Sequence, residues 1–281
     1  MSFSVFAAVL FAALLHASWN ALIKISGDRL VIMSVTTGSA SILVLPALFF
    51  LPLPDSASWG YLLASALIHS FYMLLLVHAY GLGDFAQVYP VARGSAPLLT
   101  ALLGFLLLGE SMSVVELSGM LLIVFGILGL TLEQSAGIRQ LGRAALFYSL
   151  LTGLCISAYS IVDGTGARLS GNSHSYTAWM FFLDGFIVPA YALIKRPLPQ
   201  IRTAIGEVWL SGLCVAVLST LGYWLVIWAF TQERIAPVAV LRETSVLFAL
   251  FISVFFIGER FSRLRTLVTI LIVVGVICLR I

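Results

Sequence analysis

The feature that most constrains this chain is the succession of long apolar runs that fills almost its whole length. A membrane span needs about 20 apolar residues, and ten such runs can be drawn, at residues 3–25, 30–51, 59–81, 85–108, 114–132, 144–162, 174–194, 208–230, 235–257 and 264–279. The 281 residues are 61% hydrophobic and only 10% charged, whereas ordinary soluble domains carry roughly 25% charge. The sequence therefore predicts an integral membrane protein.

The runs are typical of helices. Only helices and closed barrels satisfy backbone polar groups within a bilayer, and these runs lack the alternation over about ten residues that marks a barrel strand. The first run has no Lys or Arg before it and contains Trp19, so we interpret it as a retained span and not as a signal peptide. The expected fold is all-α, with ten transmembrane helices.

An internal repeat divides the chain. Residues 79–110 recur in altered form as residues 229–259, so that Arg93 aligns with Arg242 and the Gly-Glu pair ending at Glu110 aligns with the pair ending at Glu259. A weaker match places Trp19 on Tyr159. We predict two five-helix repeats, residues 1–133 and 144–281, joined by a loop at 134–143. Because five is odd, the second repeat is inverted relative to the first.

Basic residues predict the orientation. The odd-numbered connections hold ten of them: Lys24, Arg29, Arg139, Arg143, Lys195, Arg196, Arg202, Arg260, Arg263 and Arg265. The even-numbered connections and the tail hold three: Arg168, Arg234 and Arg280. Basic residues collect on the cytoplasmic side of a cell membrane, so both termini of this multi-pass inner-membrane protein are expected outside.

Several motifs resemble those of a known family. The chain carries His-Ala-Ser-Trp-Asn-Ala-Leu-Ile-Lys at 16–24, Val-Tyr-Pro-Val-Ala-Arg-Gly-Ser-Ala-Pro at 88–97, and two Gly-Glu corners. With its two five-helix units, it resembles the EamA-type members of the drug/metabolite transporter superfamily over its whole length. This resemblance implies a carrier, usually an exporter of small metabolites or drugs, with a central cavity between the repeats. Residues 28–30 and 162–168 also resemble a subset associated with phosphonate metabolism.

Four charged side chains lie well inside the predicted spans: Arg93, Asp184, Arg242 and Glu243. Facing lipid, each would cost roughly 2.5–3.5 kcal/mol, or on the order of 10 kcal/mol together, so they are expected to face the interior of the bundle or water. Two interpretations stay open. The charges form structural ion pairs between the repeats, or the two arginines hold a carboxylate, phosphate or phosphonate in two-point contact.

Polar and aromatic side chains on shared helix faces complete the predicted site. The residues predicted to bind substrate are His16, Trp19, Asn20, His69, Tyr72, Tyr89, Arg93, Tyr159, Trp179, Tyr223, Arg242 and Glu243. Asp184 is the candidate carrier of a coupling proton, and either acidic residue could instead meet a cationic group. For the aromatic and histidine residues, ordinary helix packing is the alternative.

Prolines and the Gly-Glu corners carry weaker signals. Pro90, Pro97 and Pro237 are expected to break spans four and nine, either to line a cavity or simply to bend a helix. Glu110 and Glu259 are expected to cap or pair at the membrane surface.

No enzyme, phosphate-loop or metal-binding motif is present, so we predict no catalytic residues, no cofactor and no metal. The predicted function is secondary transport of a small amphipathic or zwitterionic metabolite such as an organophosphonate or an amino-acid-like compound, and the resemblance implies that the direction is export. The expected partners are this substrate and membrane lipid, without nucleic acid, for a monomer or homodimer. The alternative is a non-transporting membrane protein, either a lipid-handling enzyme or an assembly scaffold.

Overall fold

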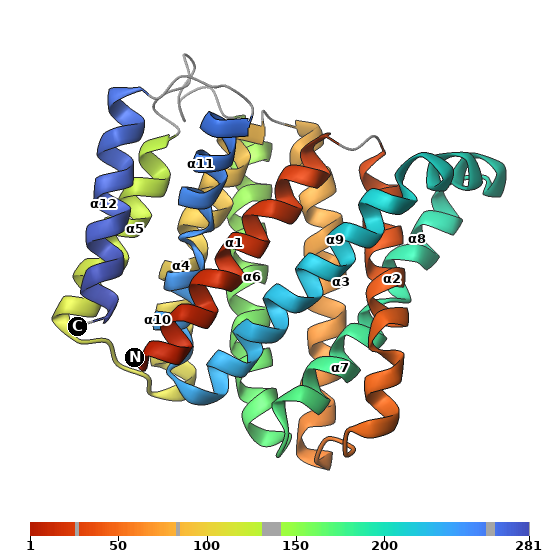
Figure 1. The fold of residues 1–281 in the computed structure, drawn as a ribbon, viewed down its shortest axis with the longest axis horizontal. Helices are drawn as coiled ribbons and strands as arrows, with labels where there is room; N and C mark the ends of the chain where they lie inside the picture. The colour runs from red at the N-terminus through yellow and green to blue at the C-terminus, as the bar shows by residue number, and fades with distance from the viewer. Residues whose placement is uncertain (26–27, 83–84, 131–141, 257–261, 281) are drawn as a thin grey trace.

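The computed structural model describes residues 1–25, 28–82, 85–130, 142–256 and 262–280. Within these ranges, the side chains of residues 24–25, 76–82, 85–90, 253 and 256 are not described. All regular structure in the described ranges is helical (Figure 1).

The first half contains α1 (Phe3–Ile25), α2 (Arg29–Phe50), the short 3-10 helix η1 (Ser56–Ser58), α3 (Trp59–Leu82), α4 (Phe85–Leu108) and α5 (Val114–Gly129). The second half contains α6 (Arg143–Leu169), α7 (Ser173–Asp184), α8 (Ile187–Lys195), α9 (Leu198–Gln232), α10 (Ile235–Arg242), α11 (Ser245–Phe256) and α12 (Arg263–Arg280).

These helices account for the ten predicted spans. In the described part of the chain, eight segments are long and apolar enough to cross a membrane, and α7 with α8 and α10 with α11 each form one of them. The remaining two are α5, which is apolar but has 16 residues, and α12, which carries Arg263, Arg265 and Arg280. Both chain termini lie at the same end of the bundle (Figure 1), as an even number of spans requires.

Helix packing reflects the two repeats. Helix α1 packs on α9 and on α11, and its counterpart α6 packs on α3 and on α4. Helix α2 packs on α9, as α7 packs on α3, while α2 with α7 and α5 with α12 pair across the repeats. A two-fold relation between the halves produces this set of contacts, because each contact either has an equivalent or joins two equivalent helices.

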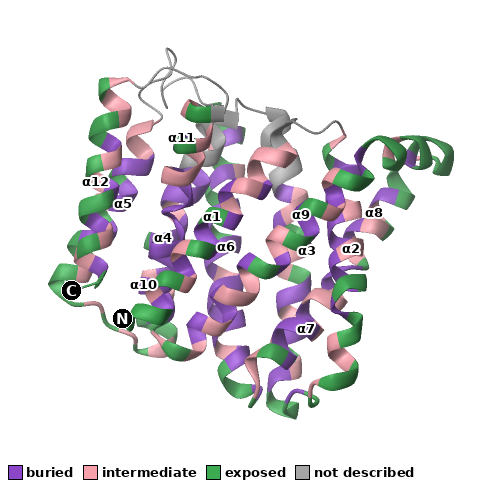
Figure 2. Ribbon diagram, in the orientation of Figure 1, coloured by how far each residue is buried: buried purple, intermediate pink, exposed green. Residues whose placement is uncertain are grey.

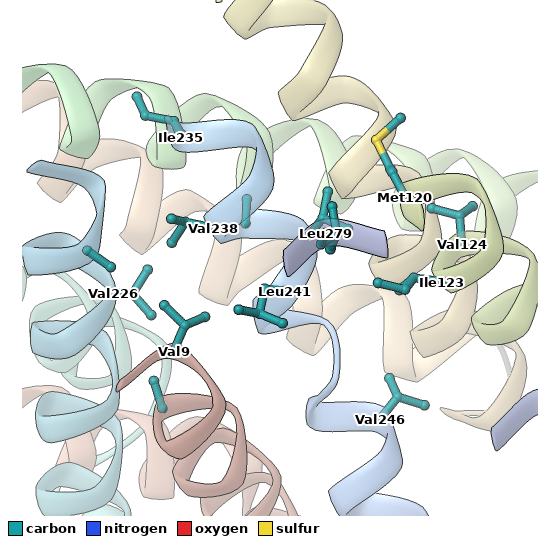
Figure 3. Packing of buried hydrophobic residues seen from close by; sticks show 14 of the residues in the cluster. Val9, Met120, Ile123, Val124, Val226, Ile235, Val238, Leu241, Val246 and Leu279 are labelled. Atoms are coloured by element: carbon teal, nitrogen blue, oxygen red, sulfur yellow. The ribbon is translucent and has the colours of Figure 1, made fainter. Parts of the chain in front are cut away.

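The outer surface is apolar, as contact with lipid requires. Large side chains such as Phe49, Phe105 and Phe255 are 85%, 61% and 68% exposed, and exposed residues follow the outward faces of the helices (Figure 2). A soluble monomer rarely tolerates so much exposed apolar surface. Inside, Val9, Val226, Val238, Leu241 and Val246 belong to the main core cluster (Figure 3).

Four of the expected span limits or breaks are wrong. Helix α9 begins at Leu198 and not at residue 208, which places Arg202 inside this helix and not in a connection. Helix α6 does not end at residue 162 but continues to Leu169, and α4 runs unbroken through Pro90 and Pro97. Around Pro97, hydroxyl groups bond the carbonyls of α4: Ser95 donates to Ala92 O at 3.1 Å and Ser157 of α6 donates to Ala96 O at 2.8 Å.

The real breaks occur elsewhere, between α7 and α8 and between α10 and α11. Pro237 is the third residue of α10, where a missing N–H costs no intrahelical bond. The regular α-helices instead end beside Asp184 and beside Glu243, where a short turn follows. These are two of the four interior charges.

Candidate functional site

A cavity lies among α1, α2, α3, α6, α7, α9 and α10. Aromatic side chains form much of its wall: Trp19, Tyr72, Tyr159, Phe181 and Tyr223. Four ionisable side chains also line it: His16, His69, Asp184 and Arg242. An apolar space with a few polar groups is typical of a small-molecule site.

The cavity brings together eight of the residues singled out from the sequence: His16, Trp19, His69, Tyr72, Tyr159, Asp184, Tyr223 and Arg242. Trp19 and Tyr159, which align in the internal repeat, both contribute to the wall. The two five-helix units therefore each supply an aromatic residue from their first helix to the same space.

Asn20 and Trp179, which were also predicted to bind substrate, do not line the cavity. Asn20 donates through Nδ2 to the carbonyl of His16, one turn earlier in α1, at 2.8 Å. Trp179 packs edge-on against Trp59, with ring centroids 5.1 Å apart. Tyr89 belongs to α4, but its side chain lies outside the described ones.

The two repeat-related arginines differ in their surroundings. Arg93 Nε lies 2.8 Å from Glu243 Oε2, and the two side chains are 2% and 1% exposed. Arg93 Nη2 also donates to Ser245 Oγ at 3.2 Å. Neither Arg93 nor Glu243 lines the cavity. This buried ion pair joins α4 of the first repeat to the break between α10 and α11 of the second.

Arg242 instead faces the cavity. Its guanidinium carbon lies 5.8 Å from the ring centroids of both Tyr159 and Tyr223, and its Nη2 donates to the Tyr159 hydroxyl at 3.4 Å. Its Nε is buried and has no hydrogen-bond partner among the described residues. Within those residues, no ion pair shorter than 4.0 Å joins Arg242 to a carboxylate. Aromatic ring faces stabilise this cation, and donor capacity remains for an anion.

Asp184 is the last residue of α7 and also lines the cavity. It is 7% exposed and accepts a hydrogen bond from Ser70 Oγ at 3.1 Å. The neighbouring break is held by α2, because Ser41 Oγ donates to Phe182 O at 3.0 Å. A Cβ at Gly185 would meet Ser41 Cβ at 2.2 Å, so only glycine allows this close approach.

The sequence-based site omitted Asp163. This residue lies inside α6 and its side chain is 0% exposed. It accepts hydrogen bonds from His69 Nε2 at 3.0 Å, from Tyr176 OH at 3.1 Å and from Tyr223 OH at 2.6 Å. The internal repeat could have located it. Aligning Trp19 with Tyr159 also aligns Ile23 with Asp163. Because Ile23 lies within the first predicted span, the repeat places Asp163 inside a span as well.

A second polar network closes the end of the bundle near both termini. Arg168 Nη1 lies 3.0 Å from Glu110 Oε1, and its Nε and Nη2 donate to the carbonyls of Phe230 and Glu233 at 2.9 and 2.8 Å. Glu110 Oε2 accepts from Ile235 N at 2.9 Å, which caps α10. The expected capping and pairing role of Glu110 is thus confirmed, whereas Glu259 lies outside the described residues. Arg168 belongs to the last turn of α6 and not to a connection.

Metal binding has no support in the described ranges, where no group of three or more His, Cys, Asp or Glu side chains could hold an ion. The three cysteines are free.

The fold and the cavity define a polytopic membrane protein whose two repeats surround a central binding space, which is the architecture of a carrier. The model of the EamA-like transporter family matches residues 3–132 and 143–281. The chain belongs to this family and is a membrane transporter of small substrates.

The other comparisons add the fold. One solved structure, described only as the crystal structure of a protein, superposes with a TM-score of 0.79 at 16% identity, and the match covers 99% of this chain and 96% of that one. At this identity the likeness shows the fold alone. A comparison with curated proteins finds no match.

Proposed function

We propose that the protein is a secondary active exporter of a small zwitterionic or amphipathic metabolite, which it moves by alternating access through the central cavity. An organophosphonate and an amino-acid-like compound are the substrate types that suit it. The observation that carries this proposal is the pair of opposite charges on one aromatic-lined cavity: Arg242, without a carboxylate partner among the described residues, and Asp184.

Each part of the substrate has a partner of suitable chemistry. The guanidinium fork of Arg242 suits two-point contact with a carboxylate, phosphate or phosphonate. The Asp184 carboxylate suits an ammonium group. The rings of Trp19, Tyr72 and Phe181 offer apolar and aromatic contact to the portion between the charged ends.

The first experiment compares three probes that share a phenyl ring and differ in which charged groups they carry. Purified protein in proteoliposomes is offered radiolabelled phenylalanine, phenylpropionate, which lacks the ammonium group, and phenethylamine, which lacks the carboxylate. 2-Aminoethylphosphonate tests the phosphonate class in parallel. We expect at least one zwitterion to exchange across the membrane faster than either of the singly charged probes. Equal leakage of all four, matching protein-free liposomes, would count against the proposal.

Sidedness follows from the basic residues. We propose that the end of the bundle bearing both termini faces outside, because ten basic residues in or beside the odd-numbered connections oppose three in or beside the even-numbered connections and the tail. A reporter that is active only in the cytoplasm is therefore expected to be inactive when fused after Ile281. Full reporter activity would invert the orientation.

A further inference from the structure

Asp163 is the centre of a buried polar cluster that the substrate contacts do not use. Its carboxylate takes three hydrogen bonds, from His69 of α3, Tyr176 of α7 and Tyr223 of α9. An ionised carboxylate can only accept hydrogen bonds, and each of these partners can donate one. The arrangement ties three helices to α6 through a single carboxylate.

Ionisable groups surround this carboxylate from every side of the cluster. His69 stacks on Tyr159 with ring centroids 4.1 Å apart, and Asp184 interacts electrostatically with both His69 and Asp163. Arg242 of α10 faces the rings of Tyr159 and Tyr223, and His16 of α1 interacts with Arg242. On α4, Arg93 is paired with Glu243.

The net charge of these groups depends on whether the cluster binds one further proton. The groups near the pair include two carboxylates, Asp163 and Asp184, and one guanidinium, that of Arg242 beside Tyr159 and Tyr223. With the Arg93–Glu243 pair counted as neutral, the cluster is net negative while the imidazoles are neutral. One added proton makes it neutral. Charges interact more strongly when they are buried than in bulk water. Adding one proton therefore changes the electrostatic interactions of these buried groups strongly.

His69 gives that proton a route. The imidazole lines the cavity, whereas Asp163 does not. Its Nε2 lies 3.0 Å from Asp163 Oδ2, and the second ring nitrogen of an imidazole can bind a proton while the first keeps its hydrogen bond. A proton that arrives through the cavity can therefore neutralise Asp163 without displacing its three partners.

We propose that the His69–Asp163 pair is the proton-carrying site that couples transport to a pH gradient. This proposal rests on the function proposed above. Tyr223 connects the pair to the substrate site, because its hydroxyl donates to Asp163 at 2.6 Å while its ring faces Arg242. Substrate at Arg242 therefore acts beside the same tyrosine that holds the proton-carrying carboxylate.

A measurement on purified protein tests the site without any substrate. Infrared difference spectra between neutral and acidic pH detect the protonation of buried carboxyl and imidazole groups. We expect the same bands to be lost in Asp163→Asn and in His69→Gln and to persist in Asp184→Asn. The exposed Asp55→Asn serves as the control, since its side chain caps no helix. Bands that survive in His69→Gln, or that disappear only in Asp184→Asn, would overturn the assignment.

The choice of variants keeps this test informative if one of them fails to fold. Thermal unfolding in detergent identifies such a failure. Should Asp163→Asn unfold, His69→Gln decides, because its side-chain amide still donates to Asp163 and its position is part of the cavity wall. Asp163→Glu, which retains the carboxylate, is expected to recover part of the acid-induced signal.

Transport separates the coupling from the carrier function itself. With phenylalanine in proteoliposomes, a pH gradient should drive accumulation by the parent, and Asp163→Asn should reduce accumulation to the level without a gradient while exchange remains measurable. Gradient-driven accumulation by Asp163→Asn equal to that of the parent would refute the coupling role. If the parent moves none of the probes, the proposed function fails for them, while the infrared comparison still decides whether the pair carries the proton.

Discussion

Replacing Arg93 by methionine is expected to lower the free energy of unfolding by about 3–5 kcal/mol, because the substitution leaves the buried carboxylate of Glu243 without its partner. Glu243→Met should have a similar cost, since it removes the carboxylate that pairs with the buried guanidinium. The double variant, in contrast, removes both charges and retains apolar volume. Its stability should return close to that of the parent, because well-packed apolar residues often replace a buried ion pair without loss.

Denaturant unfolding in detergent micelles, followed for both single variants and the double variant, measures this recovery. Arg196→Met is the matched control, since Arg196 pairs with Asp28 at a partly exposed position where the side chains are 37% and 24% accessible. A pair of that kind contributes about 0–1 kcal/mol. If the double variant is as unstable as the singles, the ion pair alone does not explain the importance of Arg93.

The internal repeat predicted the fold well but not the roles of its arginines. Arg93 and Arg242 align, yet the residue that follows is Gly94 in one repeat and Glu243 in the other. A side chain at position 94 would collide with Leu128, whose Cδ2 lies 2.9 Å from an ideal Cβ. The second repeat supplies a carboxylate at this position, that of Glu243, and it pairs with the arginine of the first repeat. This pairing is a tertiary contact, so sequence alone left both interpretations open.

The number of spans was predictable because each membrane-spanning helix needs about 20 mostly apolar residues. This requirement does not depend on which helices it packs against. Helix ends were less predictable. Asp163 ended the apolar run at residue 162, although the hydrogen bonds from His69, Tyr176 and Tyr223 allow the helix to continue past the carboxylate. Hydropathy assigns a cost to a charge but contains no information about donors on other helices. The prediction therefore missed Asp163, which is buried and has three hydrogen-bond partners on other helices.

The cavity lining was partly predictable for a related reason. Trp19, Tyr72, Tyr159 and Tyr223 were selected as aromatic residues that share helix faces with charges, and the cavity lies where those faces meet. Trp179 satisfied the same criterion but packs against Trp59. Helical spacing identifies the face of a residue but not the neighbour that covers it.

Replacing Arg242 by methionine is expected to weaken ligand binding without lowering stability, whereas the same change at Arg93 is expected to lower stability. No carboxylate within 4.0 Å in the described structure depends on Arg242, so its loss leaves no unpaired partner, and the free energy of unfolding should stay the same or rise. Binding of an anion-bearing probe should weaken by about 1–3 kcal/mol, the worth of a charge-assisted hydrogen bond, which corresponds to about 5- to 150-fold in Kd.

The three aromatic probes locate that loss within the ligand. Calorimetric or scintillation-proximity titrations should show weaker binding of phenylalanine and phenylpropionate to Arg242→Met, and unchanged or tighter binding of phenethylamine, because removal of the guanidinium also removes a repulsive charge from the cavity. Arg242→Lys keeps the charge but not the fork, so its affinity for the two carboxylates should fall between those of the parent and Arg242→Met. An equal loss for all three probes would mean that Arg242 shapes the cavity and does not bind the anionic group.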